Sequence, residues 1–117
     1  MKSTITRAAL VISALILSAA AAQAAAMLTA PNGMTLYVFD KDKGGVSSCY
    51  DNCAKKWPAY LGKEGDKMTD GWTIVKRTDG SMQLAYDSKP TYFFKNDKKE
   101  GDMKGDGMGG VWHIVTK

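Results

Sequence analysis

The sequence lacks the motifs of the common enzyme classes. It contains one histidine, His113, and it has no G-x-S-x-G, no glycine-rich phosphate loop after a strand, no pair of histidines at metal-binding spacing and no C-x-x-C-H haem motif. The usual arrangements for nucleophilic, phosphoryl-transfer, zinc and haem chemistry are therefore absent. We expect a protein without catalytic activity.

Long apolar runs are also missing, except at the N-terminus. Residues 8–22 form an apolar stretch that follows two basic residues and ends in Ala22-Gln23-Ala24. The stretch is shorter than the roughly 20 residues of a membrane-spanning helix, and an A-x-A cleavage site follows it. We therefore predict a signal peptide over residues 1–24, with Ala26 as a second cleavage position, and no membrane span.

Signals for lipid attachment and for folded-protein export are missing as well. No cysteine stands near the predicted cleavage site, and no pair of arginines precedes the apolar stretch. A lipid anchor is therefore not expected. The expected location is the periplasm or the outside of the cell.

Neither positive nor negative charge is in large excess. The net charge of the chain is +4, and Lys2 and Arg7, within the predicted signal peptide, carry two of these charges. The rest, residues 25–117, is long enough for one domain and has interleaved lysines and aspartates. Nucleic acid and anionic membrane surfaces are therefore not expected partners, and the sequence does not indicate any other partner.

Cysteine is limited to Cys49 and Cys53. In an exported chain such a pair is expected to form a disulfide, and closing so short a loop contributes about 2 kcal/mol in the chain-entropy model. A redox-active pair is the alternative, although dithiol enzymes use C-x-x-C and this spacing has one residue more. We favour a structural disulfide.

A motif of aromatic residues occurs twice. The pattern Y-x-F-x-x-D recurs after 55 residues, and the same offset pairs Trp57 with Trp112. We therefore predict two degenerate repeats, about 34–60 and 89–115, within one domain. The motif residues of the first and then the second copy are Tyr37, Phe39, Asp42, Tyr92, Phe94 and Asp97.

Alternating apolar residues and turn signals predict a mainly β fold, a small antiparallel domain. Asn32-Gly33 stands between two such runs and indicates a hairpin. In the second run, period-2 geometry places Tyr37 and Phe39 on one face of the strand, and Leu36 and Val38 on the other. Six short strands are expected, at residues 27–30, 34–39, 72–76 and 82–86, at the second motif copy, and at 111–116.

One short helix is expected between Ser48 and Tyr60, with Ser48 as its N-cap and Pro58 ending it. Residues 72–75 and 112–115 have similar sequences, so we expect them to be equivalent strands of two half-sheets, related by an approximate internal twofold. In that arrangement the three tryptophans and the motif aromatics form the core.

The motif itself is interpreted as the end of a core strand. A carboxylate just past such a strand can accept backbone N–H bonds and stabilise the turn, which explains Asp42 and Asp97 without a ligand. The alternative is an exposed aromatic platform for a sugar or another ring-shaped ligand. That alternative requires the faces of Tyr37 and Tyr92 to stay open.

The double motif, with C-x3-C and Trp-Pro after the first copy and Gly-x-Trp after the second, resembles a bacterial family of predicted secreted or lipid-anchored repeat proteins. That family is defined by Y-x-[FWY]-x-x-D and has no established activity. The resemblance implies a two-repeat fold and export, and it implies no function. The chain departs from lipid-anchored members because it lacks a lipobox cysteine, and Lys104 and Met108 stand where a second cysteine pair would be.

Two metal hypotheses remain beside the main expectation of no cofactor. Met103, Met108 and His113 are spaced by five residues, and thioether and imidazole ligands suit copper, above all Cu(I). Calcium is the weaker hypothesis. It rests on Asp40, Asp42 and Asp51, which stand at positions one, three and twelve of a loop without the usual bidentate glutamate.

These observations predict an exported, non-enzymatic binding or structural module whose ligand the sequence does not identify. The alternatives are a periplasmic copper-handling protein that uses the methionines and the histidine, and a thiol-disulfide redox protein that uses the two cysteines.

Overall fold

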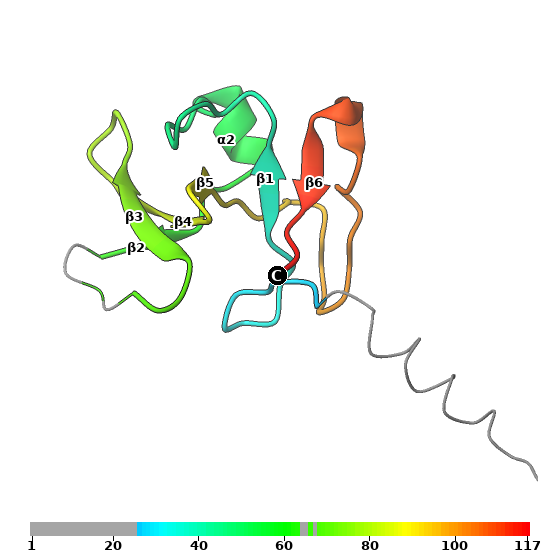
Figure 1. Ribbon diagram of the computed structural model, residues 1–117. Coiled ribbons are helices and arrows are strands. Elements are labelled where there is room, and N and C mark those ends of the chain that lie inside the picture. Colours follow the sequence, from blue (N-terminus) through cyan, green and yellow to red (C-terminus); the bar gives the residue numbers. More distant parts are fainter. Residues whose placement is uncertain (1–25, 64–65, 67) are drawn as a thin grey trace, which may run out of the picture.

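Short strands in two antiparallel sheets make up the fold (Figure 1). The structure is a computed structural model that describes residues 26–63, 66 and 68–117, so the predicted signal peptide lies outside the described residues. One sheet pairs β1 (Tyr37–Phe39) with β6 (Trp112–Ile114). The other has the order β2-β4-β3, with β5 also paired to β4; these strands are β2 (Leu61–Gly62), β3 (Trp72–Lys76), β4 (Met82–Tyr86) and β5 (Lys89–Pro90).

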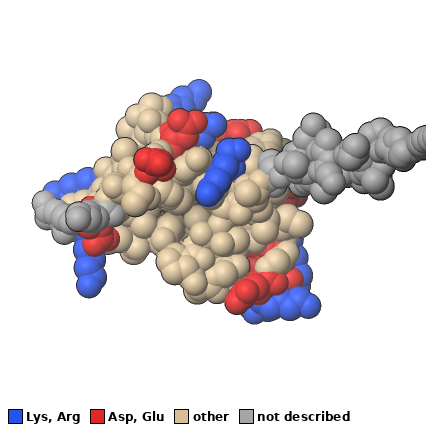
Figure 2. All heavy atoms as spheres, turned by 60° about the horizontal axis from the view of Figure 1, so that its bottom comes forward, with Lys and Arg blue, Asp and Glu red and all other residues tan. Residues whose placement is uncertain are grey.

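This architecture confirms the predicted mainly β fold with one short helix. Among the helices of the described residues, none is both long enough and apolar enough to cross a membrane. On the face drawn in Figure 2, basic and acidic side chains are interspersed, and neither sign forms a continuous patch.

The β3–β4 hairpin forms where the sequence predicts it. Both strands have the expected bounds, and Ile74 lies opposite Leu84 in the register. β-branched residues favour β3. The turn between the strands is stabilised by Asp79, whose Oδ1 accepts the N–H (2.9 Å) and the hydroxyl (2.6 Å) of Ser81.

The turn at Asn32-Gly33 also forms. Gly33 donates its N–H to the carbonyl of Ala30 (2.8 Å), and Asn32 Oδ1 accepts the N–H of Met34 (2.9 Å). Gly33 has φ +84°, a conformation that residues with a Cβ rarely adopt. Only isolated bridges flank this turn, so the predicted strand at residues 27–30 is reduced to single paired residues.

The helix is shorter than predicted. Helix α2 spans Asn52–Lys56 and ends at Trp57, just before Pro58. The prediction of Ser48 as N-cap is wrong, because Ser48 donates its N–H (2.7 Å) and its hydroxyl (2.9 Å) to Asp42 Oδ1 instead. Asp51 occupies the N-cap position.

The two faces of β1 build two separate cores, as the period-2 pattern predicts. Phe39 packs against the first core, and Val38 against the second. The buried residues of the first core are Tyr37, Cys49, Trp57, Tyr92, Phe94 and Trp112. Those of the second core are Leu28, Ala30, Leu36 and Val115.

An approximate internal twofold is visible in two rings of three backbone hydrogen bonds. In each ring every residue donates its N–H to the next carbonyl, over 2.8–3.2 Å. One ring joins Leu28, Val115 and Leu36, and the other joins Leu84, Tyr60 and Thr91. Leu28, Val115 and Leu36 correspond to Leu84, Tyr60 and Thr91, respectively. Corresponding residues are 55 or 56 positions apart in the chain, which agrees with the repeat in the sequence.

Two strand predictions are corrected. The pairing of Tyr37 with Ile114 is repeated 55 residues away in the chain as the bridge between Tyr92 and Ala59. Residues 112–115 therefore correspond to residues 57–60 and are not equivalent to residues 72–75. The second motif copy is not a regular strand either. β5 ends at Pro90, which has no N–H for a ladder, and Tyr92 makes isolated bridges to Tyr37 and Ala59.

Candidate functional site

Four aromatic rings form a column at the boundary between the two repeats. Trp57 and Trp112 stack at its centre, with ring centroids 3.8 Å apart. Phe39 stacks on Trp112 at 4.1 Å, and Phe94 stacks on Trp57 at 4.2 Å. Each phenylalanine therefore packs on the tryptophan of the other repeat, and the column buries apolar surface only when both repeats are folded.

The motif tyrosines and aspartates also form contacts between the repeats: each tyrosine bonds to the aspartate of the other repeat. The hydroxyl of Tyr37 donates to Asp97 Oδ2 (2.6 Å), and the hydroxyl of Tyr92 donates to Asp42 Oδ2 (2.7 Å). Tyr37 and Tyr92 also exchange backbone N–H bonds of 2.8 and 2.9 Å. We call these the reciprocal Tyr–Asp pairs.

Burial of the reciprocal pairs decides between the two interpretations of the motif. Tyr37 and Tyr92 are both fully buried (0% exposed), so the exposed aromatic platform is wrong. Burial, followed by the hydrogen bond from its hydroxyl to Asp97, raises the pKa of Tyr37. Burial is also the main cause that raises the pKa of Tyr92. Both hydroxyls thus remain protonated donors at neutral pH.

Each motif aspartate also accepts a backbone N–H, as the sequence suggests. Asp42 Oδ1 accepts from Ser48 (2.7 Å), and Asp97 Oδ1 accepts from Lys104 (3.0 Å). Lys104 therefore corresponds to Ser48 in the structure, and Gly105 corresponds to Cys49. This correspondence is shifted by one residue from the gapless alignment, which pairs Cys49 with Lys104. A Cβ at Gly105 would collide with the Trp57 ring.

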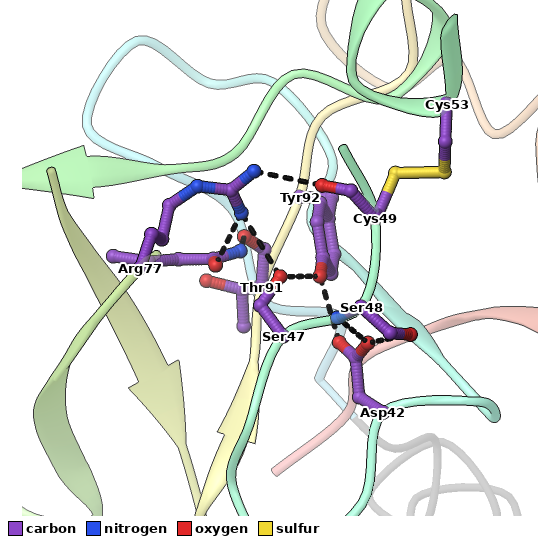
Figure 3. The surroundings of a disulfide bond; sticks show 9 residues. Asp42, Ser47, Ser48, Cys49, Cys53, Arg77, Thr91 and Tyr92 are labelled. Atoms are coloured by element: carbon purple, nitrogen blue, oxygen red, sulfur yellow. Dashed lines mark hydrogen bonds between the residues drawn. A yellow bond between two sulfur atoms is a disulfide. The ribbon is translucent and has the colours of Figure 1, made fainter. Parts of the chain in front are cut away.

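A buried arginine extends one of the reciprocal pairs into a chain of hydrogen bonds (Figure 3). Arg77 donates to Ser47 Oγ (2.9 Å), Ser47 is bonded to the hydroxyl of Tyr92, and Tyr92 donates to Asp42. All donors can point the same way, from the guanidinium to the carboxylate, and such chains are mutually polarised. Arg77 also donates to Gln83 Oε1 (2.8 Å).

The disulfide is held by the same arginine. Cys49 and Cys53 are bonded to each other, and the carbonyl of Cys49 accepts an N–H of Arg77 (2.7 Å). Cys49 is fully buried in the first core, and Cys53 is partly buried. Sequence analysis missed Arg77, Ser47 and Gln83. The available signal was that Arg77 is the sole arginine after residue 7 in a lysine-rich chain.

A groove lies at one end of the aromatic column. It has a volume of about 530 Å³, and the residues that line it come from β1, from the loop after β1, and from the turn between β4 and β5. They include Phe39, Asp40, Asp42, Asp87, Ser88 and Lys89. A second hollow of about 260 Å³ shares Asp40, Asp87 and Lys89 with the groove and adds His113.

Two of the proposed copper ligands, Met108 and His113, line different hollows. Met103 and Met108 are exposed (48% and 45%). Met108 lines a hollow beside Phe94, whereas His113 lines the hollow next to the groove and its Nε2 lies 2.8 Å from Asp40 Oδ2. The copper hypothesis stays a prediction.

The calcium hypothesis gains no support. Asp42 already accepts hydrogen bonds on both oxygens, from Ser48 and from Tyr92. Across residues 26–63, 66 and 68–117, no three His, Cys, Asp or Glu side chains are arranged to hold a metal ion.

The fold and the exchanged contacts define a class: a small mainly β module built from two interlocked repeats. Residues 19–60 and 73–116 each match the model of a family described as a secreted repeat of unknown function, and the chain belongs to this family. The matched segments contain the predicted repeats, and the family resemblance stated from the motif is confirmed. No curated protein and no solved structure matches the chain.

Proposed function

We propose that this chain is an exported, non-enzymatic binding module. In this proposal the repeat motif is the scaffold, and the groove beside Phe39 is the ligand site. The observation that supports it most directly is that the polar groups of the motif bond to one another. Both tyrosine hydroxyls and both aspartates of the motif bond to one another, which supports a scaffold role for the motif and leaves ligand contacts to other residues of the groove.

The groove has the size of a small-molecule site. Its volume of about 530 Å³ falls within the range of such sites, which combine an apolar surface with a few polar groups. Residues of both repeats line it, so its shape depends on their association. The hydrogen bonds of the reciprocal Tyr–Asp pairs hold Asp42, at the groove wall, in one orientation.

Fragment screening by NMR tests this proposal. The ¹⁵N-labelled mature protein, residues 25–117, is titrated with a small-molecule fragment library, and amide shifts are mapped onto the structure. We expect the shifts of bound fragments to concentrate on residues 38–45 and 87–90. A library without hits, or hits scattered over the surface, would contradict a binding site in the groove.

A further inference from the structure

We propose that the groove accepts a planar aromatic ligand that carries a positive charge. This inference rests on the proposed function, and it names the ligand class of the same site. It is argued from the end of the aromatic column, from the charges beside it and from a comparison with the other end of the same column.

Phe39 supplies the apolar surface. One face of its ring is covered by Trp112, with the ring planes 10° apart, and the residue nevertheless lines the groove and is only partly buried. In this proposal the ligand ring lies on the other face of Phe39 and continues the column of four stacked rings. Stacked aromatic pairs contribute beyond the apolar area that they bury.

The charges around Phe39 favour a cation. Asp40, Asp42 and Asp87 line the groove, against the single cation Lys89. Asp40 is bonded to His113, and Asp42 to Tyr92 and Ser48. The two ion pairs in the described part of the chain involve neither Asp87 nor Lys89. Asp87 is therefore the carboxylate best placed to pair with a ligand cation.

The opposite end of the column provides an internal comparison. There the last ring, Phe94, is only 5% exposed. The hollow beside it is smaller, about 290 Å³, and the charged residues that line it are Lys56 and Lys95. Lys95 occupies the position that Asp40 has in the first repeat. The two repeats thus share the column and differ in the access and the charge at its ends.

A matched pair of probes tests the ligand class. N-methylquinolinium is a planar aromatic cation, and quinoline is its neutral counterpart at pH 7. Each is titrated into the ¹⁵N-labelled mature protein. We expect both to shift residues 38–45 and 87–90, with the cation bound about two- to five-fold more tightly, the range of an exposed cation–π contact or ion pair. Added salt should weaken binding of the cation and leave quinoline unchanged.

Three variants localise the charge effect. Asp87→Asn should weaken binding of N-methylquinolinium about two- to five-fold, and Lys89→Met should strengthen it by a similar factor. Asp51→Asn is the matched control. Asp51 and Asp87 are both exposed aspartates at positive φ (53° and 52°), and the side chain of Asp51 makes no cap hydrogen bond. Asparagine has the same size and shape as aspartate, so both variants should fold. The control should leave affinity unchanged.

The outcomes separate the two proposals. Equal affinity of both probes at the groove, with no effect of Asp87→Asn, would overturn the preference for a cation and leave the groove as a binding site. Shifts centred on Phe94 would overturn the assigned end of the column. Absence of shifts at the groove with every probe and fragment would overturn the binding function, and the ligand class with it.

Discussion

At the scale of single residues, the reciprocal Tyr–Asp pairs explain why the motif needs these residue types. Tyrosine combines a ring that fills the first core with a hydroxyl that reaches the aspartate of the other repeat. Asp97 is itself buried (6% exposed), and the hydroxyl of Tyr37 accepts the N–H of Gly105 at 3.2 Å. Removing either hydroxyl leaves buried groups without a partner.

We predict that Tyr37→Phe lowers the free energy of unfolding by about 1–3 kcal/mol, the cost of leaving buried polar groups unsatisfied. Tyr92→Phe should cost a similar amount. Water can replace its hydroxyl at the partly buried Asp42, but the buried hydroxyl of Ser47 also loses its partner. Urea unfolding measures both values. Tyr86→Phe, in β4, is the control and should be near neutral. A near-neutral effect of either tyrosine variant would contradict this account.

Stability should also fall at alkaline pH. The pKa values of Tyr37 and Tyr92 are raised in the folded protein, mainly by burial, above the value of about 10 in the unfolded chain. The contribution of each tyrosine is therefore fully present below about pH 10, and it is lost as the pH rises from there toward the folded pKa. Unfolding measured across this range should show a steeper decline for the wild type than for the Tyr37→Phe, Tyr92→Phe double variant.

At the scale of elements, the turn between β4 and β5 is strained. Asp87 and Ser88 join the paired residues Tyr86 and Lys89, and both have positive φ (52° and 66°). A two-residue turn of this kind favours Asn-Gly, because a residue with a Cβ is disfavoured there. The strain lies at the wall of the groove.

Ser88→Gly is therefore expected to stabilise the protein by about 1 kcal/mol, by removing a left-handed residue that carries a Cβ. In a domain of this size that gain corresponds to a rise in Tm of about 4–8 °C. Thermal unfolding followed by circular dichroism measures it. Thr78→Gly, in a turn at a residue without positive φ, is the control and should not raise Tm. An unchanged Tm for Ser88→Gly would show that the turn is not strained in solution.

At the scale of the whole molecule, the exchanged contacts make the two repeats dependent on each other. Each phenylalanine stacks on the tryptophan of the other repeat, and each tyrosine bonds to the aspartate of the other. One repeat alone would leave its half of the column, one buried tyrosine hydroxyl and one motif aspartate without partners. The repeats therefore form one cooperative unit.

We expect a single unfolding transition. Tryptophan fluorescence, which reports on the column, and far-UV circular dichroism, which reports on the sheets, should give coincident curves. Hydrogen exchange should give equal opening free energies for the amides of Tyr37 and Tyr92, since each donates to the other residue. Asp97→Ala should lower both values together, whereas Leu61→Ala, at an exposed position, should lower neither. Two separate transitions would show that the repeats fold independently.

Features that depend on neighbouring residues could be predicted from the amino-acid sequence. The bounds of β3 and β4, the turn at Asn32-Gly33 and the two faces of β1 follow from propensity, turn chemistry and period-2 alternation. The repeat and the family were also predictable, because both are patterns along the chain.

Contacts between residues far apart in the chain could not be predicted from local sequence patterns. The pairing of Tyr37 with Asp97 joins residues 60 positions apart, and no local pattern distinguishes it from pairing within one repeat. Ser48 shows the same effect, because Asp42 takes the hydrogen bonds that a helix cap would have used. The groove beside Phe39 likewise depends on how segments 38–45 and 87–90 pack together. Tertiary packing determines which of several possible hydrogen-bond partners a residue contacts. These contacts determine both the stability of the two-repeat scaffold and the position of the groove.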